Sequence, residues 1–254
     1  MTTAISDRDI MGGLAKGLAV IETFTAGRAR QSIAQVALHS GLDRATARRC
    51  LLTLARDGYA DWDGKFFTLT PRVLRLGTAC LATMPLPRIV QPLLDRLSAQ
   101  IGESSSVSIL DGAEIVYVAR AAERKVISIA LMPGSRLPAY CTSMGRVMLA
   151  ALPQTEARAR LGPGPLPALT SRTMTDPEAI LAELARIRAQ GHAQVDQEVE
   201  DGLRSIAVPV TNSHGHTVAA LNVGVSTNVP IEDLTGRYLA ALIGVQEALQ
   251  PLLR

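Results

Sequence analysis

Aromatic residues and cysteines are scarce in this chain, and long apolar runs are missing. The 254 residues include four tyrosines, three phenylalanines, one tryptophan and three cysteines. Cys50, Cys80 and Cys141 are odd in number and widely spaced, which argues against a disulfide framework and a zinc motif. No apolar run reaches the roughly 18 residues that span a bilayer, and the N-terminus lacks a signal-peptide pattern. We therefore expect no membrane partner and a cytoplasmic location.

The basic residues are distributed unevenly along the chain. Residues 1–80 contain eleven Lys and Arg against seven Asp and Glu, whereas residues 81–254 contain fifteen against sixteen. A basic excess confined to one segment is typical of a nucleic-acid-binding module. The length suits two domains, so we expect an N-terminal domain over 1–70, a linker helix over 71–84 and a C-terminal domain over 85–254.

The stretch from Gly27 to Leu69 predicts a winged helix-turn-helix. Ser32 and Gln35 form a capping box in front of one helix, and Asp43 is placed to cap the next. Asp63-Gly64 then separates two alternating runs, which is the strongest short-range signal of a β-hairpin. A helix, a turn, a second helix and a two-stranded wing are the parts of a DNA-reading domain.

The second of these helices carries the residues expected to read DNA. Ala47, Leu51 and Leu54 share an inner face at helical spacing, which leaves the arginines on the open side together with Thr46. Arginine can donate two hydrogen bonds to the O6 and N7 atoms of guanine. Lysine or arginine in the wing and before the first helix can contact phosphates. The alternative is a structural three-helix domain with a solvated basic face. The expected DNA contacts are Arg28, Ser32, Arg44, Ala45, Thr46, Arg48, Arg49 and Lys65.

Helices are also expected on either side of this motif. Leu14, Leu18 and Ile21 form an apolar stripe on a first helix, which we expect to close the core of the N-terminal domain. Pro71 suits the first turn of a helix that runs to about Thr83. Its apolar surface favours either a dimerising linker or an ordinary packing helix. Two prolines then separate it from another helix expected over 89–101.

The C-terminal two thirds changes to a period of two, which indicates strands. Helices are expected over 142–151, over 176–190, and from 231 to the end. This mixed order predicts an α+β fold, with an antiparallel sheet flanked by helices. The expected strands are 104–110, 115–119, 126–130, 205–210 and 217–225.

The segment from Arg136 to Arg146 suggests a small-molecule site. Thr142 or Ser143 can cap the helix that follows, and the first N–H groups of that helix would then point outward and attract a carboxylate. The alternative is a capped packing helix without a ligand. The residues expected around the ligand here are Tyr140, Thr142, Ser143, Met144 and Gly145.

A cluster of acids and a pair of histidines allow other interpretations. Asp196, Glu198 and Glu200 indicate either metal binding or acid–base chemistry, or else a salt-bridged sheet edge, which the nearby Arg204 favours. His214 and His216 flank a glycine and favour a solvated loop over a metal pair.

Cys141 is a candidate nucleophile, but no histidine with an orienting acid is identifiable as its partner. We therefore expect it to be a pocket or core residue. No catalytic residue, metal or cofactor is assigned.

With these residues in view, the chain from about Ile10 to its end resembles the IclR family of bacterial transcriptional regulators. The resemblance rests on the winged helix-turn-helix, the linker helix and the segments 138–146 and 195–210. Within the family, Tyr140–Arg146 and Gly202–Pro209 are most similar to regulators of the β-ketoadipate pathway. Those regulators respond to aromatic acids such as protocatechuate or 4-hydroxybenzoate.

The resemblance implies a GAF-like effector domain, homodimers through the DNA-binding and linker region, often tetramers, and a palindromic double-stranded DNA operator. Met144 is bulkier than the small residues of simpler members, and Asn222 and Gly224 stand where some members have serines. Both departures suggest a ligand unlike glyoxylate or pyruvate. The effector contacts that the resemblance implies are Ser143, Met144, Asp196, Ser205, Asn222 and Gly224.

The sequence thus predicts a ligand-responsive transcription factor without catalytic activity. An aromatic carboxylate would place its anionic group at the helix start over 143–145 and its ring against Met144. Asn222 and Asp196 would bind ring hydroxyls. The alternatives are a response to a different small organic acid, or a C-terminal domain that only oligomerises.

Overall fold

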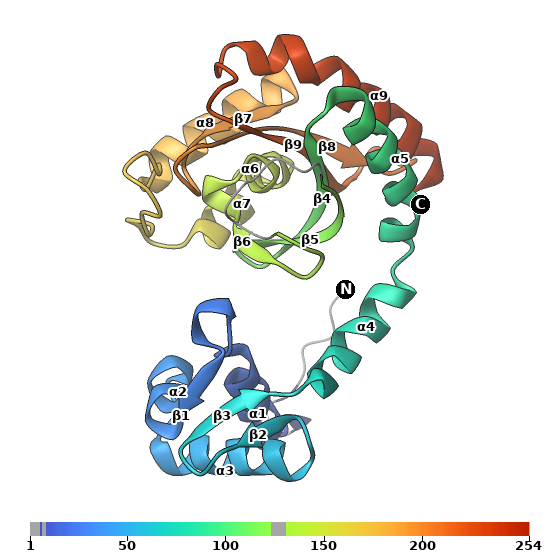
Figure 1. The fold of residues 1–254 in the computed structure, drawn as a ribbon. Coiled ribbons are helices and arrows are strands. Elements are labelled where there is room, and N and C mark those ends of the chain that lie inside the picture. The colour runs from blue at the N-terminus through green and yellow to red at the C-terminus, as the bar shows by residue number, and fades with distance from the viewer. Residues whose placement is uncertain (1–5, 7–8, 123–130, 254) are drawn as a thin grey trace. The chain divides into compact units, whose positions relative to one another are not determined.

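The chain divides into two units by its internal contacts, Met1–Ala82 and Thr83–Arg254, and each is described by itself. The computed structural model describes residues 6, 9–122 and 131–253 (Figure 1). The strand expected over 126–130 lies outside these residues. None of the described helices has both the length and the apolar character needed to cross a bilayer.

The first unit is a helical domain with a small antiparallel sheet. Its strands are ordered β1-β3-β2, so that the segment before α2 adds a third strand to the predicted hairpin. The capping box of Ser32 and Gln35 is confirmed, and the Asp63 side chain closes the hairpin turn by accepting the backbone N–H groups of Lys65 and Phe66. The elements are α1 (Gly12–Glu22), β1 (Arg30–Ser32), α2 (Ile33–Ser40), α3 (Arg44–Arg56), β2 (Ala60–Trp62) and β3 (Phe66–Leu69).

The core of this unit is closed by a different face of α1 from the one expected. Val20 is fully buried against Val36 and Leu51, whereas Leu14 is 61% exposed and Leu18 is 47% exposed. The prediction that this leucine stripe fills the core is therefore wrong. The three-helix core is small enough for Val20 and its neighbours to fill, which leaves the leucines on the surface of α1.

A helix predicted from Pro71 follows the sheet. Pro71–Val73 forms a 3₁₀ turn that continues as α4 (Leu74–Thr83). The next helix, α5 (Pro85–Ile101), begins at Pro85 and not at residue 89 as expected. Proline is tolerated in a first helical turn because the N–H that it lacks would have no intrahelical acceptor there.

The second unit is built on a curved antiparallel sheet that wraps around α6 (Figure 1). The strand order is β6-β5-β4-β9-β8-β7, and every adjacent pair is antiparallel. This confirms the α+β fold. The strands are β4 (Ser104–Asp111), β5 (Glu114–Ala121), β6 (Arg136–Pro138), β7 (Ala193–Asp196), β8 (Leu203–Thr211) and β9 (Thr217–Ser226).

Helices cover both faces of this sheet and divide its core in two. One cluster, with Leu94 and Leu221, packs under α5 and α9, and the other, with Met144 and Ile180, packs around α6 and α8. Asp176 caps α8 through its carboxylate, as predicted. The helices are α6 (Ser143–Ala150), α7 (Gln154–Leu161), α8 (Pro177–Gln190) and α9 (Ala240–Leu249), the last preceded by a π-helical turn over Thr235–Leu239.

Candidate DNA-binding surface and small-molecule cavity

Helix α3 presents a basic surface to solvent. Arg44, Ala45, Arg48 and Arg49 are exposed, while the opposite face of the helix is held in the core. The carboxylate of Asp43 caps the helix by accepting the backbone N–H of Thr46 at 2.9 Å. This hydrogen bond is the largest cause of the lowered pKa of Asp43. The cap keeps the first turn of α3 formed where the arginines emerge.

Thr46 itself does not lie on the open side, and that expectation is wrong. Its side chain is 7% exposed, and its Oγ1 accepts a hydrogen bond from Arg49 Nη2 at 3.3 Å. Viewed along the axis of α3, Thr46 lies between the buried face and Arg49. It therefore faces the side of the domain on which α1 lies. Thr46 is therefore held against Arg49, and its contact with DNA stays a prediction.

The wing and the segment before β1 add further cations. Lys65 is exposed at the hairpin turn, and Arg28 is exposed in a 3₁₀ turn over Ala26–Arg28. Arg30 is also exposed, but it pairs with Asp63 at 2.6 Å and stacks over the Phe66 ring at 4.1 Å. Its charge is thus partly compensated within the wing, whereas Lys65 has no ion pair among the described residues.

The exposed leucines of α1 line an apolar groove within the first unit. Leu14 and Leu18 share this groove with Leu76 of α4 and Tyr59. Leu76 is 53% exposed, and Leu74, also on α4, is 69% exposed. Contiguous apolar surface of this kind marks an interaction site more often than a free surface.

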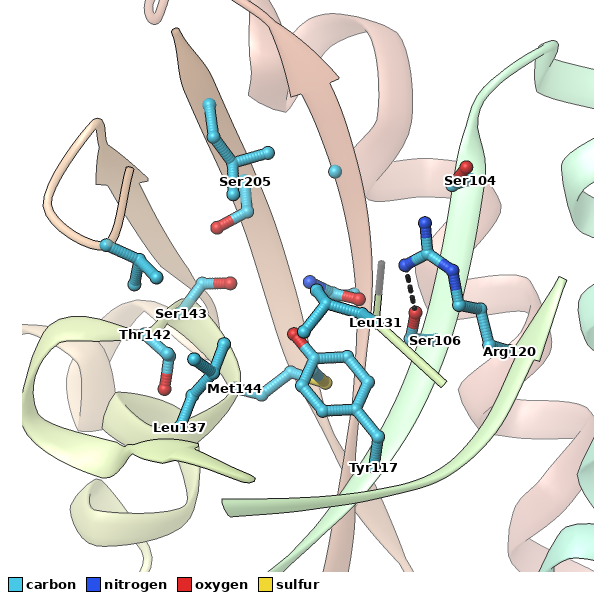
Figure 2. A pocket seen from close by; sticks show the side chains of 14 residues that line it. Ser104, Ser106, Tyr117, Arg120, Leu131, Leu137, Thr142, Ser143, Met144 and Ser205 are labelled. Atoms are coloured by element: carbon cyan, nitrogen blue, oxygen red, sulfur yellow. Dashed lines mark hydrogen bonds between the residues drawn. The ribbon is translucent and has the colours of Figure 1, made fainter. Parts of the chain in front are cut away.

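The second unit contains a cavity between the start of α6 and the sheet (Figure 2). The volume of the cavity is about 40 Å³, which is room for about three waters. An aromatic acid therefore needs some of the lining side chains to move outward. The fourteen lining residues are Ser104, Ser106, Tyr117, Arg120, Leu131, Leu137, Thr142, Ser143, Met144, Val199, Leu203, Ser205, Asn222 and Gly224.

A row of polar side chains crosses the sheet on the cavity side. Arg120 of β5, Ser106 of β4 and Asn222 of β9 are direct cross-strand neighbours, and Arg120 Nη1 donates to Ser106 Oγ at 3.3 Å. Burial lowers the pKa of Arg120. Ser104 and Ser205 lie one row further along, on either side of Gly224. One side of the cavity therefore carries a cation flanked by neutral hydroxyl and amide groups.

A β-bulge places two of these residues in the cavity. Ala119 pairs with Val107 but Tyr117 pairs with Ser108, so one extra residue of β5, Val118, is left unopposed. Strict alternation would send residues 117 and 120 to opposite faces of the sheet. The bulge turns both toward the cavity, while Val118 and Ala119 pack in the α5 and α9 cluster.

The start of α6 differs from the expected anion site. Thr142 caps the helix, and its Oγ1 accepts the N–H of Gly145 at 3.1 Å, so this N–H is not available to a ligand. Gly145 also lies outside the cavity, because a Cβ there would stand 2.2 Å from Ala139 O. Ser143 Oγ is buried without a hydrogen-bond partner in the described part of the chain. Ser108 Oγ donates to the Met144 sulfur at 3.2 Å, which orients the Met144 side chain.

Two more of the expected effector contacts lie elsewhere. The Tyr140 hydroxyl donates to Pro167 O, and the residue is buried in the core beside α6. Asp196 pairs with Arg204 at 2.6 Å and with Arg172 at 2.8 Å, which is the salt-bridged edge that the sequence allowed. Neither residue lines the cavity. Their contact with a ligand stays a prediction, whereas Thr142, Ser143, Met144, Ser205, Asn222 and Gly224 do line the cavity.

A buried ion pair ties two walls of the cavity together. Arg146, two residues after Met144, is 2% exposed and its Nη2 lies 2.7 Å from Glu198 Oε2. The same oxygen accepts the N–H of Met174 at 2.9 Å, and Arg146 Nε donates to Tyr140 O at 2.8 Å. Glu198 directly precedes Val199, so this pair holds the loop that closes the cavity against α6.

Cys141 is fully buried, and burial raises the pKa of its thiol to about 12. The thiol is therefore protonated at neutral pH, whereas a cysteine nucleophile reacts as a thiolate. Within residues 9–122 and 131–253, no three His, Cys, Asp or Glu side chains gather closely enough to hold a metal ion.

Both units match models of one protein family. Residues 13–64 match the IclR helix-turn-helix domain, and residues 78–250 match the C-terminal domain described as bacterial transcriptional regulator IclR C-terminal. The Pca regulon regulatory protein of Pseudomonas putida is 46% identical over 245 residues, which cover 96% of this chain and 84% of that protein. The p-hydroxybenzoate hydroxylase transcriptional activator of Acinetobacter baylyi is 39% identical over 229 residues, which cover 88% and 84%.

A solved structure agrees with these relatives. It is the inducer-binding domain of the PobR transcription factor from Acinetobacter, a double mutant in complex with 3-hydroxybenzoic acid. The TM-score is 0.63 at 34% identity, covering 67% of this chain and all of that chain. Because family models cover both units and full-length relatives exceed 30% identity, the chain belongs to the IclR family of bacterial transcriptional regulators.

Proposed function

We propose that this regulator binds a small aromatic carboxylic acid, of the protocatechuate or 4-hydroxybenzoate type, in the cavity beside α6. Binding changes its affinity for DNA and so controls genes for the breakdown of aromatic acids. The observation that carries this proposal is the cavity itself, which combines apolar walls with one cation, Arg120, among the described residues that line it. The names of the two relatives and the hydroxybenzoate held by the neighbouring structure support the same class of ligand.

The cavity walls suit a flat ring with polar substituents. Tyr117, Met144, Leu131 and Leu137 supply aromatic and aliphatic contacts, and serine, threonine, asparagine and arginine side chains supply the polar ones. Small-molecule sites in proteins combine apolar walls with placed polar groups in this way. No catalytic role is proposed, because the buried Cys141 thiol is neutral.

DNA recognition is assigned to the exposed side of α3 and to the wing. Arg44, Ala45, Arg48 and Arg49 would enter the major groove, with Arg28, Ser32 and Lys65 on the phosphates. Ser32 is half-buried and caps α2, so a phosphate would meet its helix N-terminus. A chain that reads the chromosome in this way would work in the cytoplasm.

Dimerisation is assigned to the apolar groove of the first unit, and tetramers would form by further association of the dimers. Two copies joined at Leu14, Leu18 and Leu76 would present two α3 helices to a palindromic operator. Light scattering of the Leu14→Asp/Leu76→Asp double variant should show a smaller assembly than the wild type. An unchanged mass would exclude this surface as the dimer contact.

The coupling between the two sites depends on differential affinity. A ligand shifts the protein between DNA-binding and non-binding arrangements only if it binds one of them more tightly. A C-terminal domain that only oligomerises would show no such coupling. Ser143→Trp fills the cavity and separates these two functions, because it should preserve DNA affinity and remove the response to ligand.

The experiment needs a DNA target, which the protein can select from a library of random duplexes. Fluorescence anisotropy on the selected duplex then gives the affinity with and without 4-hydroxybenzoate, at fixed salt. Arg48→Ala/Arg49→Ala should lose at least about 100-fold in affinity. Arg186→Ala, an exposed arginine on α8, is the control and should behave as wild type. An Arg48→Ala/Arg49→Ala variant with wild-type affinity would refute the assignment of α3.

A further inference from the structure

We propose that Arg120 binds the carboxylate of the effector and that the start of α6, at Ser143, binds a hydroxyl at the opposite end of the ring. This orientation is the reverse of the one expected from the helix start. It rests on the proposed function, since it requires that the cavity take an aromatic acid. It also narrows the ligand to benzoic acids that carry a hydroxyl across the ring from the carboxylate.

The first observation is that Arg120 has no counter-charge among the described residues. Its guanidinium is half-buried in the cavity wall, and its hydrogen bond in the described chain goes to the neutral Ser106 hydroxyl at 3.3 Å. Within residues 9–122 and 131–253, no Asp or Glu forms an ion pair with it. A partly desolvated cation is stabilised by a carboxylate, and the planar fork of arginine binds a carboxylate through two parallel hydrogen bonds.

Two acids of the segment 196–200 are held by arginines, whereas Glu200 Oε2 is buried without a hydrogen-bond partner among the described residues. Asp196 is held by Arg204 and Arg172 at the sheet edge, and Glu198 is held by the buried Arg146. A ligand carboxylate would therefore meet Arg120 without competition from these two side chains. Ser106, the cross-strand neighbour of Arg120 in β4, and Asn222, the neighbour of Ser106 in β9, can bind the carboxylate oxygens that the fork leaves open.

The helix start offers a weaker site for an anion. Thr142 Oγ1 already accepts the N–H of Gly145, and Arg146 N donates to Thr142 O. The end of a helix carries about half an elementary charge, whereas Arg120 carries a full one. What the helix start does offer is Ser143 Oγ, which is buried without a partner in the described chain. Such a group is best satisfied by a neutral hydroxyl that can both donate and accept.

The ring would lie between these two polar ends, in space made when lining side chains move outward. In Figure 2 Ser143 and Arg120 lie on opposite sides of the cavity, with Met144 and the Tyr117 ring between them. Burial raises the pKa of Tyr117 to about 12, so its hydroxyl stays neutral and does not compete for Arg120. Ser108 orients the Met144 sulfur, which presents a fixed apolar surface to the ring. A carboxylate and a hydroxyl at opposite ends of one ring match the two polar ends of the cavity.

Calorimetry with three ligands tests this orientation. The ligands are 4-hydroxybenzoate, its neutral analogue 4-hydroxybenzamide, and benzoate, which lacks the hydroxyl. The wild type should prefer the acid over the amide by about 10- to 100-fold, and 4-hydroxybenzoate over benzoate by about fivefold. Arg120→Gln should abolish the preference for acid over amide. Ser143→Ala should abolish the preference for the hydroxyl and keep the preference for the acid.

The controls separate this inference from the proposed function. Arg186→Gln should keep both preferences, and circular dichroism checks the fold of each variant. If Arg120→Gln does not fold, Arg120→Lys retains the charge without the fork and should lose part of the acid preference. An acid preference that survives Arg120→Gln but disappears in Ser143→Ala would overturn the orientation and leave the sensor function standing. A wild type that binds none of the aromatic acids would overturn the sensor function itself.

Discussion

The ion pair of Arg146 and Glu198 allows a test of how the cavity is held together. Glu198→Gln keeps the size and shape of the side chain but removes the negative charge. The guanidinium of Arg146, which is 2% exposed, keeps its hydrogen bond to Tyr140 O and loses its counter-charge. The amide that replaces the carboxylate can still accept the N–H of Met174.

The expected loss follows from burial. Removing one partner of a buried ion pair costs about 3–5 kcal/mol, because the other charge stays in a medium that solvates it poorly. Gln retains part of the hydrogen bonding, so we expect the lower end, about 3 kcal/mol. For a unit of this length each kcal/mol lowers the melting temperature by about 2–4 °C. The second unit should therefore melt roughly 6–12 °C lower in the variant.

The assay can follow the two units separately. Trp62 is the only tryptophan and belongs to the first unit, so its fluorescence reports on that unit, while circular dichroism reports on both. Glu198→Gln should move the dichroism transition of the second unit and leave the Trp62 transition in place. Glu178→Gln, which breaks an exposed pair with Arg158, should change neither, because solvent screens that pair.

Two results would refute this reasoning. If Glu198→Gln leaves both transitions unchanged, the pair is solvated and does not hold the cavity wall. If the Trp62 transition moves as far as the dichroism transition, the two units do not unfold independently and the loss cannot be assigned to the cavity.

The structure predicts the effects of three further substitutions. Lys65→Ala should weaken binding to all DNA sequences alike and lower the salt dependence by about one ion, as measured by anisotropy at several salt concentrations. Folding lowers the pKa of the Asp63 carboxyl below its unfolded value of 3.8. The carboxylate therefore stabilises the first unit above pH 3.8, and this stabilisation is lost as the pH falls below that value. Asp63→Asn should reduce the acid sensitivity of the Trp62 transition. A Trp62 transition as sensitive to acid as in the wild type would contradict this. Gly145→Ala should destabilise the second unit by about 1–3 kcal/mol in urea unfolding, because its Cβ meets the backbone of Ala139; an unchanged midpoint would show that α6 can shift away.

The parts of the molecule that the sequence predicted correctly depend on neighbours along the chain. The capping box of Ser32 and Gln35, the cap at Asp43, the hairpin at Asp63-Gly64 and the cap at Asp176 all formed as expected. Each involves hydrogen bonds between residues two or three positions apart. Such signals are visible in a sequence because the groups that satisfy one another are adjacent in it.

The predictions that were wrong depend on which face each helix or strand packs against its neighbours. Leu14 and Leu18 have the spacing of a core face, but Val20 fills the core. Thr46 was assigned to the open side by helical spacing and Asp196 to the effector site by family resemblance, but Thr46 lies on the α1 side and Asp196 pairs with Arg204. The position of each of these side chains depends on partners that are distant in the sequence.

The sequence by itself determined that this chain has a winged helix-turn-helix, a mixed α+β domain and the segments of an IclR regulator, because local hydrogen bonding and periodic burial specify them. Only the tertiary structure decided which side chains form the cavity. Arg120 reaches it because Val118 bulges out of register against β4, and one extra residue in a strand reverses the face of everything beyond it. That register depends on how β5 pairs with β4. The pattern of residues within β5 alone does not show it.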